Sequence, residues 1–233
     1  MSVIEIKNLR KIYNSTSIPV HAINGIDLDI KEGEFTAVVG PSGSGKTTML
    51  NILGGLDSPT EGQVMVNNVD LSELSSGELI NFRLRNIGFV FQSYNLIPVM
   101  TAYENVEFIM QLQKWPKQKR HERTEQLLKA VGLGERMHNR PNKLSGGQQQ
   151  RVAVARALAS KPKFILADEP TANLDSKSTE TLLDIMEQLN REENITFIFS
   201  THDQRVVKKA HRVITIEDGK VKSDVETENA VEK

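Results

Sequence analysis

An eight-residue glycine-rich segment places the strongest constraint on the fold of this chain. Residues 40–47 read Gly-Pro-Ser-Gly-Ser-Gly-Lys-Thr and match the pattern G-x-x-x-x-G-K-[ST] in full. The apolar run at 35–39 before it is typical of a strand buried on both faces. Residues 47–53 after it are predicted to form a helix. A strand, a glycine loop and a helix in this order predict an α/β domain whose loop binds the phosphates of a nucleotide.

The residue types in this loop suit phosphate binding. Glycines let the backbone approach an anion closely and point successive N–H groups at it, and the helix N-terminus adds positive potential. Lys46 is expected to reach the terminal phosphates, and the Thr47 hydroxyl is expected to ligate Mg²⁺. The predicted phosphate contacts are Gly40, Pro41, Ser42, Gly43, Ser44, Gly45, Lys46, Thr47 and Thr48. The loop alone indicates only a nucleotide, because kinases, GTPases, helicases and transport ATPases all use it.

Strands and helices alternate along most of the chain. Apolar runs or alternating patterns predict strands at 3–7, 26–30, 63–66, 87–91, 164–167, 195–199 and 213–216. Apolar stripes of helical period predict helices at 101–113, 149–159 and 176–191, and a further one that carries Leu127, Leu128 and Val131. This order favours a mostly parallel core sheet with right-handed crossovers. We interpret 1–233 as one domain, with a core at 1–99 and 144–222, an inserted helical lobe at 100–143 and a polar tail at 223–233.

Two carboxylates end the predicted strand at 164–167. In open α/β sheets, ligands bind beyond the carboxyl ends of the strands, so Asp168 and Glu169 should face the same nucleotide as Lys46. Consecutive strand residues point in opposite directions, so the two carboxylates should have different roles. Asp168 suits Mg²⁺, and Glu169 suits a base that orients or deprotonates water. The alternative is a charged pair in a solvated loop.

Two further polar residues follow buried strands at the same edge of the sheet. His202 comes after the strand at 195–199, and Gln92 after the strand at 87–91. Gln92 can supply a neutral oxygen to Mg²⁺ or to the attacking water. The other four histidines are interpreted as structural.

A second glycine motif opens the predicted helix at 149–159. Leu144–Gln148 reads Leu-Ser-Gly-Gly-Gln. A serine and two glycines at a helix N-terminus form either a second anion site or an ordinary N-cap, and the N-cap is the commoner case for such a motif by itself.

Composition excludes several kinds of protein. The chain has no cysteine, which rules out disulfides, thiolate zinc sites, iron–sulfur clusters and a cysteine nucleophile. Lys plus Arg number 29 against 30 Asp plus Glu, so the net charge of −1 does not favour nucleic-acid binding by charge alone. No apolar run approaches the ~18 residues of a membrane span, and the first residues are too charged for a signal peptide.

From about Val3 to Val221 the chain resembles the nucleotide-binding subunit of ABC transporters. Gly40–Thr47 resembles the Walker A loop, Phe164–Asp168 the Walker B strand, Leu144–Gln148 the ABC signature and Asn173–Asp175 the D-loop. Glu169 resembles the catalytic glutamate, Gln92 the Q-loop glutamine and His202 the switch histidine. Tyr13 lies where the family stacks an aromatic ring on adenine.

The resemblance implies a P-loop cassette in which an N-terminal antiparallel β subdomain and an α-helical subdomain accompany the core sheet. It implies ATP and Mg²⁺ as cofactors, with Lys46, Gln92, Glu169 and His202 in catalysis. It further implies that Thr47, Gln92 and Asp168 hold the metal. Tyr13 and the loop 40–48 would bind ATP, and the signature residues Ser145, Gly146, Gly147 and Gln148 would bind the ATP of a second copy.

Two chains of this family pack head to tail around ATP, so we expect an ATP-bound homodimer. Separate integral membrane permease subunits are the expected partners, contacted near Ser93–Met100, which is apolar for a loop. The expected location is the cytoplasm, peripheral on the inner face of the cell membrane through the permease.

The segments Phe91–Pro98 and Ser145–Val152 resemble the lipoprotein-release and macrolide-export group. A soluble ABC-type ATPase, such as an iron–sulfur assembly scaffold ATPase, is the alternative within the same fold. A nucleic-acid binder is the alternative from another class, and its basic stretch, flanked by Trp115, consists of Lys114, Lys117, Lys119, Arg120 and Arg123. The solvated start of a helix explains that stretch more simply, so no nucleic acid is expected.

Overall fold

The chain folds around two β-sheets. The structure is a computed structural model that describes residues 1–14 and 18–227. The smaller sheet is antiparallel and has the order β2-β1-β4-β5. Its strands are β1 (Ser2–Tyr13), β2 (Val20–Lys31), β4 (Glu61–Val66) and β5 (Val69–Asp70).

The larger sheet carries the site and has the order β10-β9-β3-β8-β7-β6. Its strands are β3 (Phe35–Val39), β6 (Ile87–Phe91), β7 (Phe164–Asp168), β8 (Thr196–Ser200), β9 (Arg212–Glu217) and β10 (Lys220–Glu226). All neighbouring pairs are parallel except β9 and β10. The carboxyl ends of five strands therefore meet at one edge, where β3 leads into the glycine loop. The predicted fold class is confirmed.

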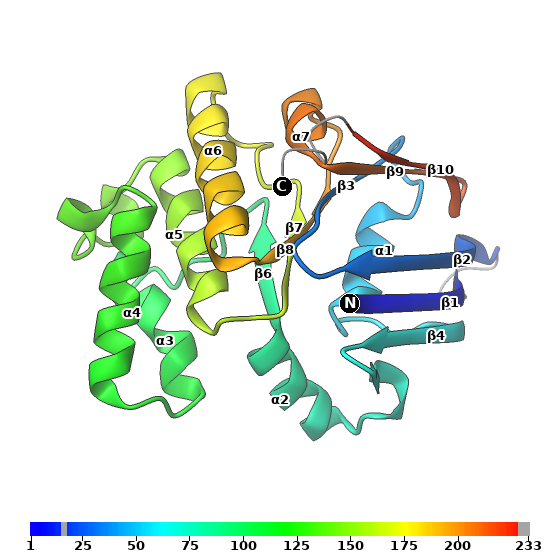
Figure 1. Ribbon diagram of the computed structural model, residues 1–233, viewed down its shortest axis with the longest axis horizontal. Coiled ribbons are helices and arrows are strands. Elements are labelled where there is room, and N and C mark those ends of the chain that lie inside the picture. Colours follow the sequence, from blue (N-terminus) through cyan, green and yellow to red (C-terminus); the bar gives the residue numbers. More distant parts are fainter. Residues whose placement is uncertain (15–17, 228–233) are drawn as a thin grey trace.

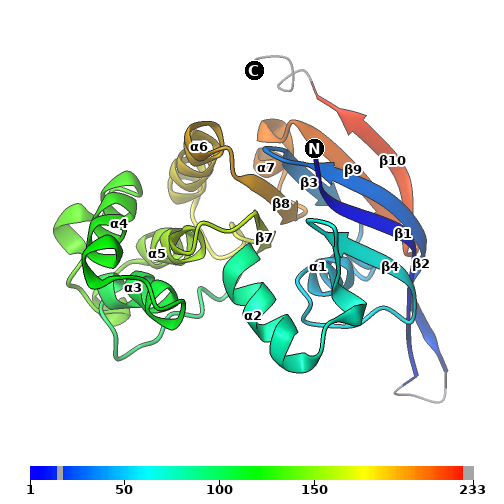
Figure 2. The ribbon, with the colours of Figure 1, turned by 60° about the horizontal axis from the view of Figure 1, so that its bottom comes forward.

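Helices cover the larger sheet on both faces. They are α1 (Lys46–Leu53), α2 (Ser76–Asn86), α3 (Ala102–Leu112), α4 (Lys117–Ala130), α5 (Gly146–Ala159), α6 (Ser176–Glu193) and α7 (Gln204–Lys209). Figures 1 and 2 show α3, α4 and α5 grouped on one side of the molecule and the antiparallel sheet on the other, with the larger sheet between them. In the part of the chain that the structure describes, no helix is long and apolar enough to cross a membrane.

The central strands bury side chains on both faces, which accounts for their unbroken apolar sequences. On β7, Phe164 and Leu166 pack with α1 and the antiparallel sheet. Ile165 and Ala167 point the other way, toward α5, α6 and the helical group. All four are at most 3% exposed. Because β7 is fixed from both sides, the residues that follow it start from a rigid position.

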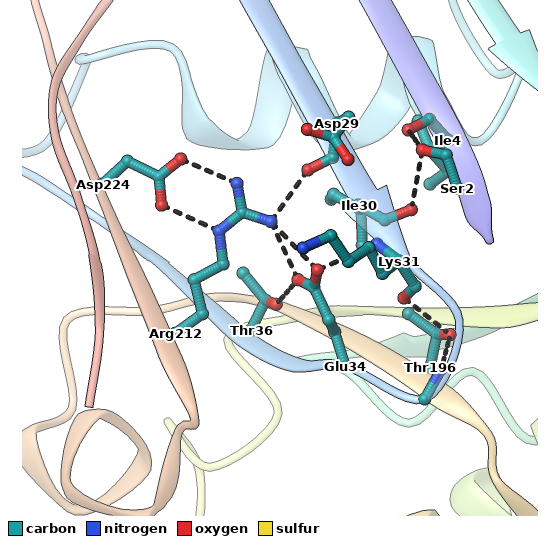
Figure 3. Close-up of polar contacts among 11 residues, drawn as sticks. Ser2, Ile4, Asp29, Ile30, Lys31, Glu34, Thr36, Thr196, Arg212 and Asp224 are labelled. Atoms are coloured by element: carbon teal, nitrogen blue, oxygen red, sulfur yellow. Dashed lines mark hydrogen bonds and ion pairs between the residues drawn. The ribbon is translucent and has the colours of Figure 1, made fainter. Parts of the chain in front are cut away.

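Arg212 joins the two sheets at the start of β9 (Figure 3). Its Nε and Nη2 each donate a 2.7 Å hydrogen bond to the Asp224 carboxylate on β10. Its Nη1 donates to the backbone oxygen of Asp29 on β2, at 2.8 Å, and to Glu34, at 3.0 Å. The hydrogen bonds that Arg212 donates to Asp224 and the charge of Glu34 raise the pKa of Arg212 above its usual value.

The structure corrects two features of the sequence interpretation. The polar tail predicted from residue 223 is wrong at its start, because β10 continues to Glu226. The turn at Asp218 and Gly219, both with positive φ, returns the chain along β9. β10 is an exposed strand, so its sequence lacks the apolar alternation that marks a half-buried one. Helices α2 and α7 were not predicted, because α2 has no buried residue and the six-residue α7 has only Val206 buried. The rest of the predicted tail, 228–233, lies outside the described residues.

Candidate nucleotide-binding site

The glycine loop adopts a backbone that few other residues allow. Gly45, at the start of α1, has φ of +104°, and an added Cβ would lie 2.4 Å from the backbone oxygen of Ala22. Gly43 has φ of +78° and nothing within 4 Å of an added Cβ. Gly45 is thus required for packing, whereas Gly43 leaves open space at the tip of the loop.

Lys46 and Ser44 carry polar groups that are buried within the loop. Lys46 is 8% exposed, and its Nζ donates hydrogen bonds of 2.9 Å to the backbone oxygens of Gly40 and Pro41. In the described part of the chain, the buried Ser44 Oγ has no hydrogen-bond partner. A buried hydroxyl without a partner costs about 1–3 kcal/mol, and a phosphate oxygen would satisfy it.

The two carboxylates after β7 have separate partners. Asp168, the last residue of β7, accepts a 3.2 Å hydrogen bond from Thr47 Oγ1 on α1. Glu169 leaves the strand with φ of +45°, and its N–H donates to Ser200 O at 2.9 Å. The two carboxylates thus have different partners, and Glu169 does not continue the alternation of the strand.

Glu169 and His202 are in direct contact. Glu169 Oε1 lies 2.7 Å from His202 Nδ1, and Thr201 Oγ1 donates to the other carboxylate oxygen at 3.3 Å. The Glu169 side chain is 20% exposed and that of His202 is 76% exposed. The pair therefore consists of a partly buried carboxylate and an imidazole at the surface.

One cavity of about 770 Å³ brings most of the predicted residues together. The predicted residues that line it are Tyr13, Gly40, Pro41, Ser42, Gly43, Gly45, Lys46, Thr47, Thr48, Gln92, Glu169 and His202. Ser44 and Asp168 do not line it, although Asp168 is bonded to Thr47. His21, which the sequence analysis treated as structural, lines the cavity as well.

The signature residues are not part of this cavity. Ser145 caps α5, where its Oγ accepts from Gln148 N–H at 3.3 Å and its own N–H donates to Gln148 Oε1 at 2.9 Å. An added Cβ on Gly146 would lie 2.7 Å from the Tyr94 hydroxyl, and one on Gly147 would lie 2.8 Å from Ser178 Oγ. Both glycines thus also serve close packing within the chain.

A second layer of polar residues supports the strand ends. Asp203 caps α7 and accepts a 2.9 Å hydrogen bond from Thr171 Oγ1. The Arg205 side chain, hydrogen-bonded to Asp203, lowers the pKa of Asp203 to about 2 against the opposing effect of burial. Sequence reasoning did not identify these contacts, because nothing in the motifs connects residues 32 positions apart.

Oxygen ligands for a hard cation are present where they were predicted. Thr47 and Asp168 already touch, and Gln92 lines the same cavity. Among residues 1–14 and 18–227, no three His, Cys, Asp or Glu side chains form a cage for a metal ion. Mg²⁺ needs no such cage, since it keeps several waters and binds through one or two protein oxygens plus phosphates. The residues present fit this ion.

The basic stretch is partly occupied by internal ion pairs. Arg120 lies 3.0 Å from Glu107, and Arg123, 6% exposed, lies 2.6 Å from Glu193 on α6. Because these two guanidinium groups hold α4 to its neighbours, they are not presented to a nucleic-acid backbone.

The fold and site define a P-loop nucleoside triphosphatase: a parallel sheet with the phosphate loop, the Thr47–Asp168 pair and the Glu169–His202 pair at one edge. A model of the ABC transporter family matches residues 23–172. The chain belongs to the family of ABC transporter ATP-binding proteins, as the sequence resemblance predicted, and it is an ATPase of that family.

Individual relatives cover almost the whole chain. An uncharacterized ABC transporter ATP-binding protein of Thermotoga maritima is 48% identical over 94% of this chain and 93% of its own length. The dimeric structure of the ATP-binding cassette MJ0796 of Methanocaldococcus jannaschii, bound to ADP and Pi, has a TM-score of 0.87 and 46% identity, covering 96% of this chain and 98% of that one.

The macrolide export ATP-binding/permease protein MacB of Hyphomonas neptunium is 47% identical over 95% of this chain, which spans 34% of that protein. The predicted similarity to the macrolide-export group is confirmed. These comparisons give no support to the iron–sulfur assembly scaffold alternative.

Proposed function

We propose that this chain hydrolyses Mg²⁺–ATP at the interface of an ATP-bound homodimer and thereby drives a separate membrane permease. One observation carries the proposal: a single cavity combines Lys46, Gln92 and the Glu169–His202 pair, with Thr47 and Asp168 in contact at its edge. These are the groups needed to bind a triphosphate, to hold its metal and to orient a water.

Lys46 and the loop bind the phosphates. The Lys46 ammonium exchanges its hydrogen bonds to the Gly40 and Pro41 oxygens for phosphate oxygens, and Ser44 Oγ gains the partner it lacks. Thr47, Gln92 and Asp168 would hold Mg²⁺, which would supply positive charge to offset the charge that develops on the phosphates.

Glu169 is the base. Its carboxylate orients the attacking water and accepts its proton, while the contact with His202 fixes the position of the carboxylate. Thr201 holds the second carboxylate oxygen, so the side chain has one defined direction.

The signature completes the site from a second copy. Ser145–Gln148 open α5 outside the cavity of their own chain, with Ser145 exposed. A helix N-terminus preceded by serine and glycines suits the γ-phosphate of the partner's ATP. A two-fold arrangement produces two equivalent sites, which the dimeric MJ0796 cassette with ADP and Pi supports.

The permease docks beside the segment Ser93–Met100. A groove of about 460 Å³ with a largely apolar lining lies between α2, β6 and α3, and Ile97 lines it. Val99, in the same segment, is 74% exposed. The segment begins directly after Gln92 in the cavity, so a permease helix in the groove would lie next to the nucleotide site. This docking places the chain in the cytoplasm, on the inner face of the membrane.

The test compares Lys46→Ala with Lys129→Ala, a control on the exposed face of α4. ATP affinity is measured by calorimetry, turnover by phosphate release and dimer formation by sedimentation with and without ATP. Lys46→Ala should weaken ATP binding at least about tenfold and abolish turnover and dimer formation. Wild-type turnover in Lys46→Ala, or an equally tight dimer without nucleotide in the unmodified chain, would refute the proposal.

A further inference from the structure

The hydroxyl of Tyr13 is bonded to a carboxylate that lies outside every motif of the nucleotide site. Tyr13 is the last residue of β1, pairs with Val20 of β2 and lines the cavity beside the phosphate loop. Its hydroxyl donates a 2.7 Å hydrogen bond to Oδ2 of Asp57. A carboxylate 44 positions away in sequence therefore restrains the direction of the ring, together with Thr48 of the phosphate loop.

Asp57 is itself fixed from three sides. Lys11 Nζ donates to its Oδ1 at 2.6 Å, and the Ser58 N–H donates to the same oxygen at 2.7 Å. The N–H of Asp57 donates to the backbone oxygen of Asn51 in α1 at 3.2 Å. Because α1 begins at Lys46, the helix that carries the phosphate lysine also anchors the carboxylate that holds Tyr13.

Lys11 also acts on the ring directly. Lys11 and Tyr13 are two residues apart on β1, and the pairing of β1 with β2 shifts register between Lys11 and Ile12. The Lys11 ammonium lies 4.8 Å from the centroid of the Tyr13 ring, within the range of a cation–π contact. It covers one face of the ring, so a planar base has the opposite face for stacking.

At neutral pH the Tyr13 hydroxyl is protonated and the Asp57 carboxylate is ionised, as their hydrogen bond requires. Burial and the hydrogen bond to Asp57 raise the pKa of Tyr13 and outweigh the opposing effect of a hydrogen bond with Thr48, so the hydroxyl keeps its proton. Burial acts to raise the pKa of Asp57, but the hydrogen bonds from Lys11, Tyr13 and Ser58 outweigh it and lower that pKa. The bond between Tyr13 and Asp57 is therefore charge-assisted at neutral pH.

We infer that Asp57, together with Lys11, is a positioning residue that orients the ring of Tyr13 for stacking on the base of the bound nucleotide. The inference rests on the proposed function, in which Tyr13 contacts adenine. Asp57 does not line the cavity, so it acts through Tyr13 and not on the nucleotide itself. Its loss should weaken binding of a nucleotide with a base and leave the binding of phosphates alone unchanged.

The experiment measures the affinity of the full chain for two ligands by calorimetry in the presence of Mg²⁺. One ligand is ADP, which is not turned over, and the other is inorganic pyrophosphate, which has no base. Asp57→Ala should weaken ADP binding roughly three- to tenfold, a part of the loss expected from removing a stacking ring, and change pyrophosphate binding less than about twofold. Asp57→Asn, which still accepts from the Tyr13 hydroxyl, should recover part of the ADP affinity.

A double-mutant cycle isolates the contact. Tyr13→Phe removes the hydroxyl and keeps the ring, so it should match Asp57→Ala, and the double variant should be no weaker than either single variant. Asp27→Ala is the matched control, because Asp27 also accepts a hydrogen bond from β1, at Asn8 N–H, and does not line the cavity. It should leave both affinities unchanged.

The remaining outcomes distinguish failure of the positioning role of Asp57 from failure of the proposed function. A Tyr13→Ala variant that loses ADP affinity while Asp57→Ala keeps it overturns the positioning role and leaves the proposed function intact. Equal losses of ADP and pyrophosphate affinity in Asp57→Ala, or additive losses in the cycle, also overturn it, because both indicate a general structural brace. Unchanged ADP affinity in Lys46→Ala would instead refute the proposed function itself.

Discussion

Replacing Glu169 with glutamine should separate ATP binding from ATP hydrolysis. Glutamine keeps the length of the side chain and can still accept from Thr201 and contact His202. Both residues carry a Cβ, so the backbone cost of φ +45° at this position is the same in each. What the substitution removes is the negative charge and nearly all of the basicity.

The expected magnitude follows from the role of the base. A positioned general base contributes about 10²–10⁴-fold in rate, which corresponds to roughly 3–5 kcal/mol of activation free energy. The contacts that hold the side chain survive, so the free energy of unfolding should change by less than about 1 kcal/mol. The loss should therefore appear in turnover and not in ATP affinity, and the variant should accumulate as an ATP-bound dimer.

The assay is phosphate release, paired with size-exclusion chromatography in ATP and a urea titration. Glu104→Gln is the matched control, because it removes the same charge from the capping box of α3, where glutamine serves as well as glutamate. A Glu169→Gln protein that stays monomeric in ATP, or that hydrolyses ATP at close to the wild-type rate, would show that the base is a different residue.

Three further changes test other parts of the structure. Gly45→Ala places a Cβ 2.4 Å from the Ala22 oxygen at φ +104°, and should lower both the unfolding free energy, by roughly 1–3 kcal/mol, and ATP affinity, as measured by urea titration and calorimetry. The pKa of Asp203 is lowered to about 2, so its ionised carboxylate stabilises the fold at pH values above the ordinary carboxyl pKa of about 4. This contribution is lost as pH falls from about 4 to 2. Asp203→Asn should therefore lower the free energy of unfolding, measured by urea titration at pH 7, by about 2 kcal/mol. The difference from wild type should shrink as pH falls from about 4 to 2, and a constant difference would contradict this. Ile97→Glu should reduce cosedimentation with membrane vesicles that contain the permease while leaving basal ATPase activity unchanged, and full cosedimentation would argue against docking in the groove.

Motifs with fixed spacing made most of the site predictable from sequence. Lys46, Glu169 and His202 each follow a buried strand directly or within a few residues, and parallel strands end at one edge of a sheet. Once the strands were identified by their apolar runs, topology alone brought these residues to one cavity. The predictions failed for β10 and α2, where exposure removes the apolar pattern that sequence reasoning depends on, and for α7, which is too short to show a helical stripe.

The contacts that fix the site residues were beyond sequence reasoning for a different reason. Asp57 and Tyr13 are 44 positions apart, and they meet only because the loop after α1 is bonded to Asn51 and lies against β1. Gln150, fully buried on the signature helix, donates to the Phe91 and Pro170 backbone oxygens at 3.2 and 2.7 Å. It thereby ties the start of α5 to the segments that carry Gln92 and Glu169. In the proposed dimer, the signature residues bind the ATP of the second copy, and Gln92 and Glu169 bind the ATP of this chain. Gln150 would then join the two sets of residues through one buried side chain, which would couple closure of the dimer to alignment of the base.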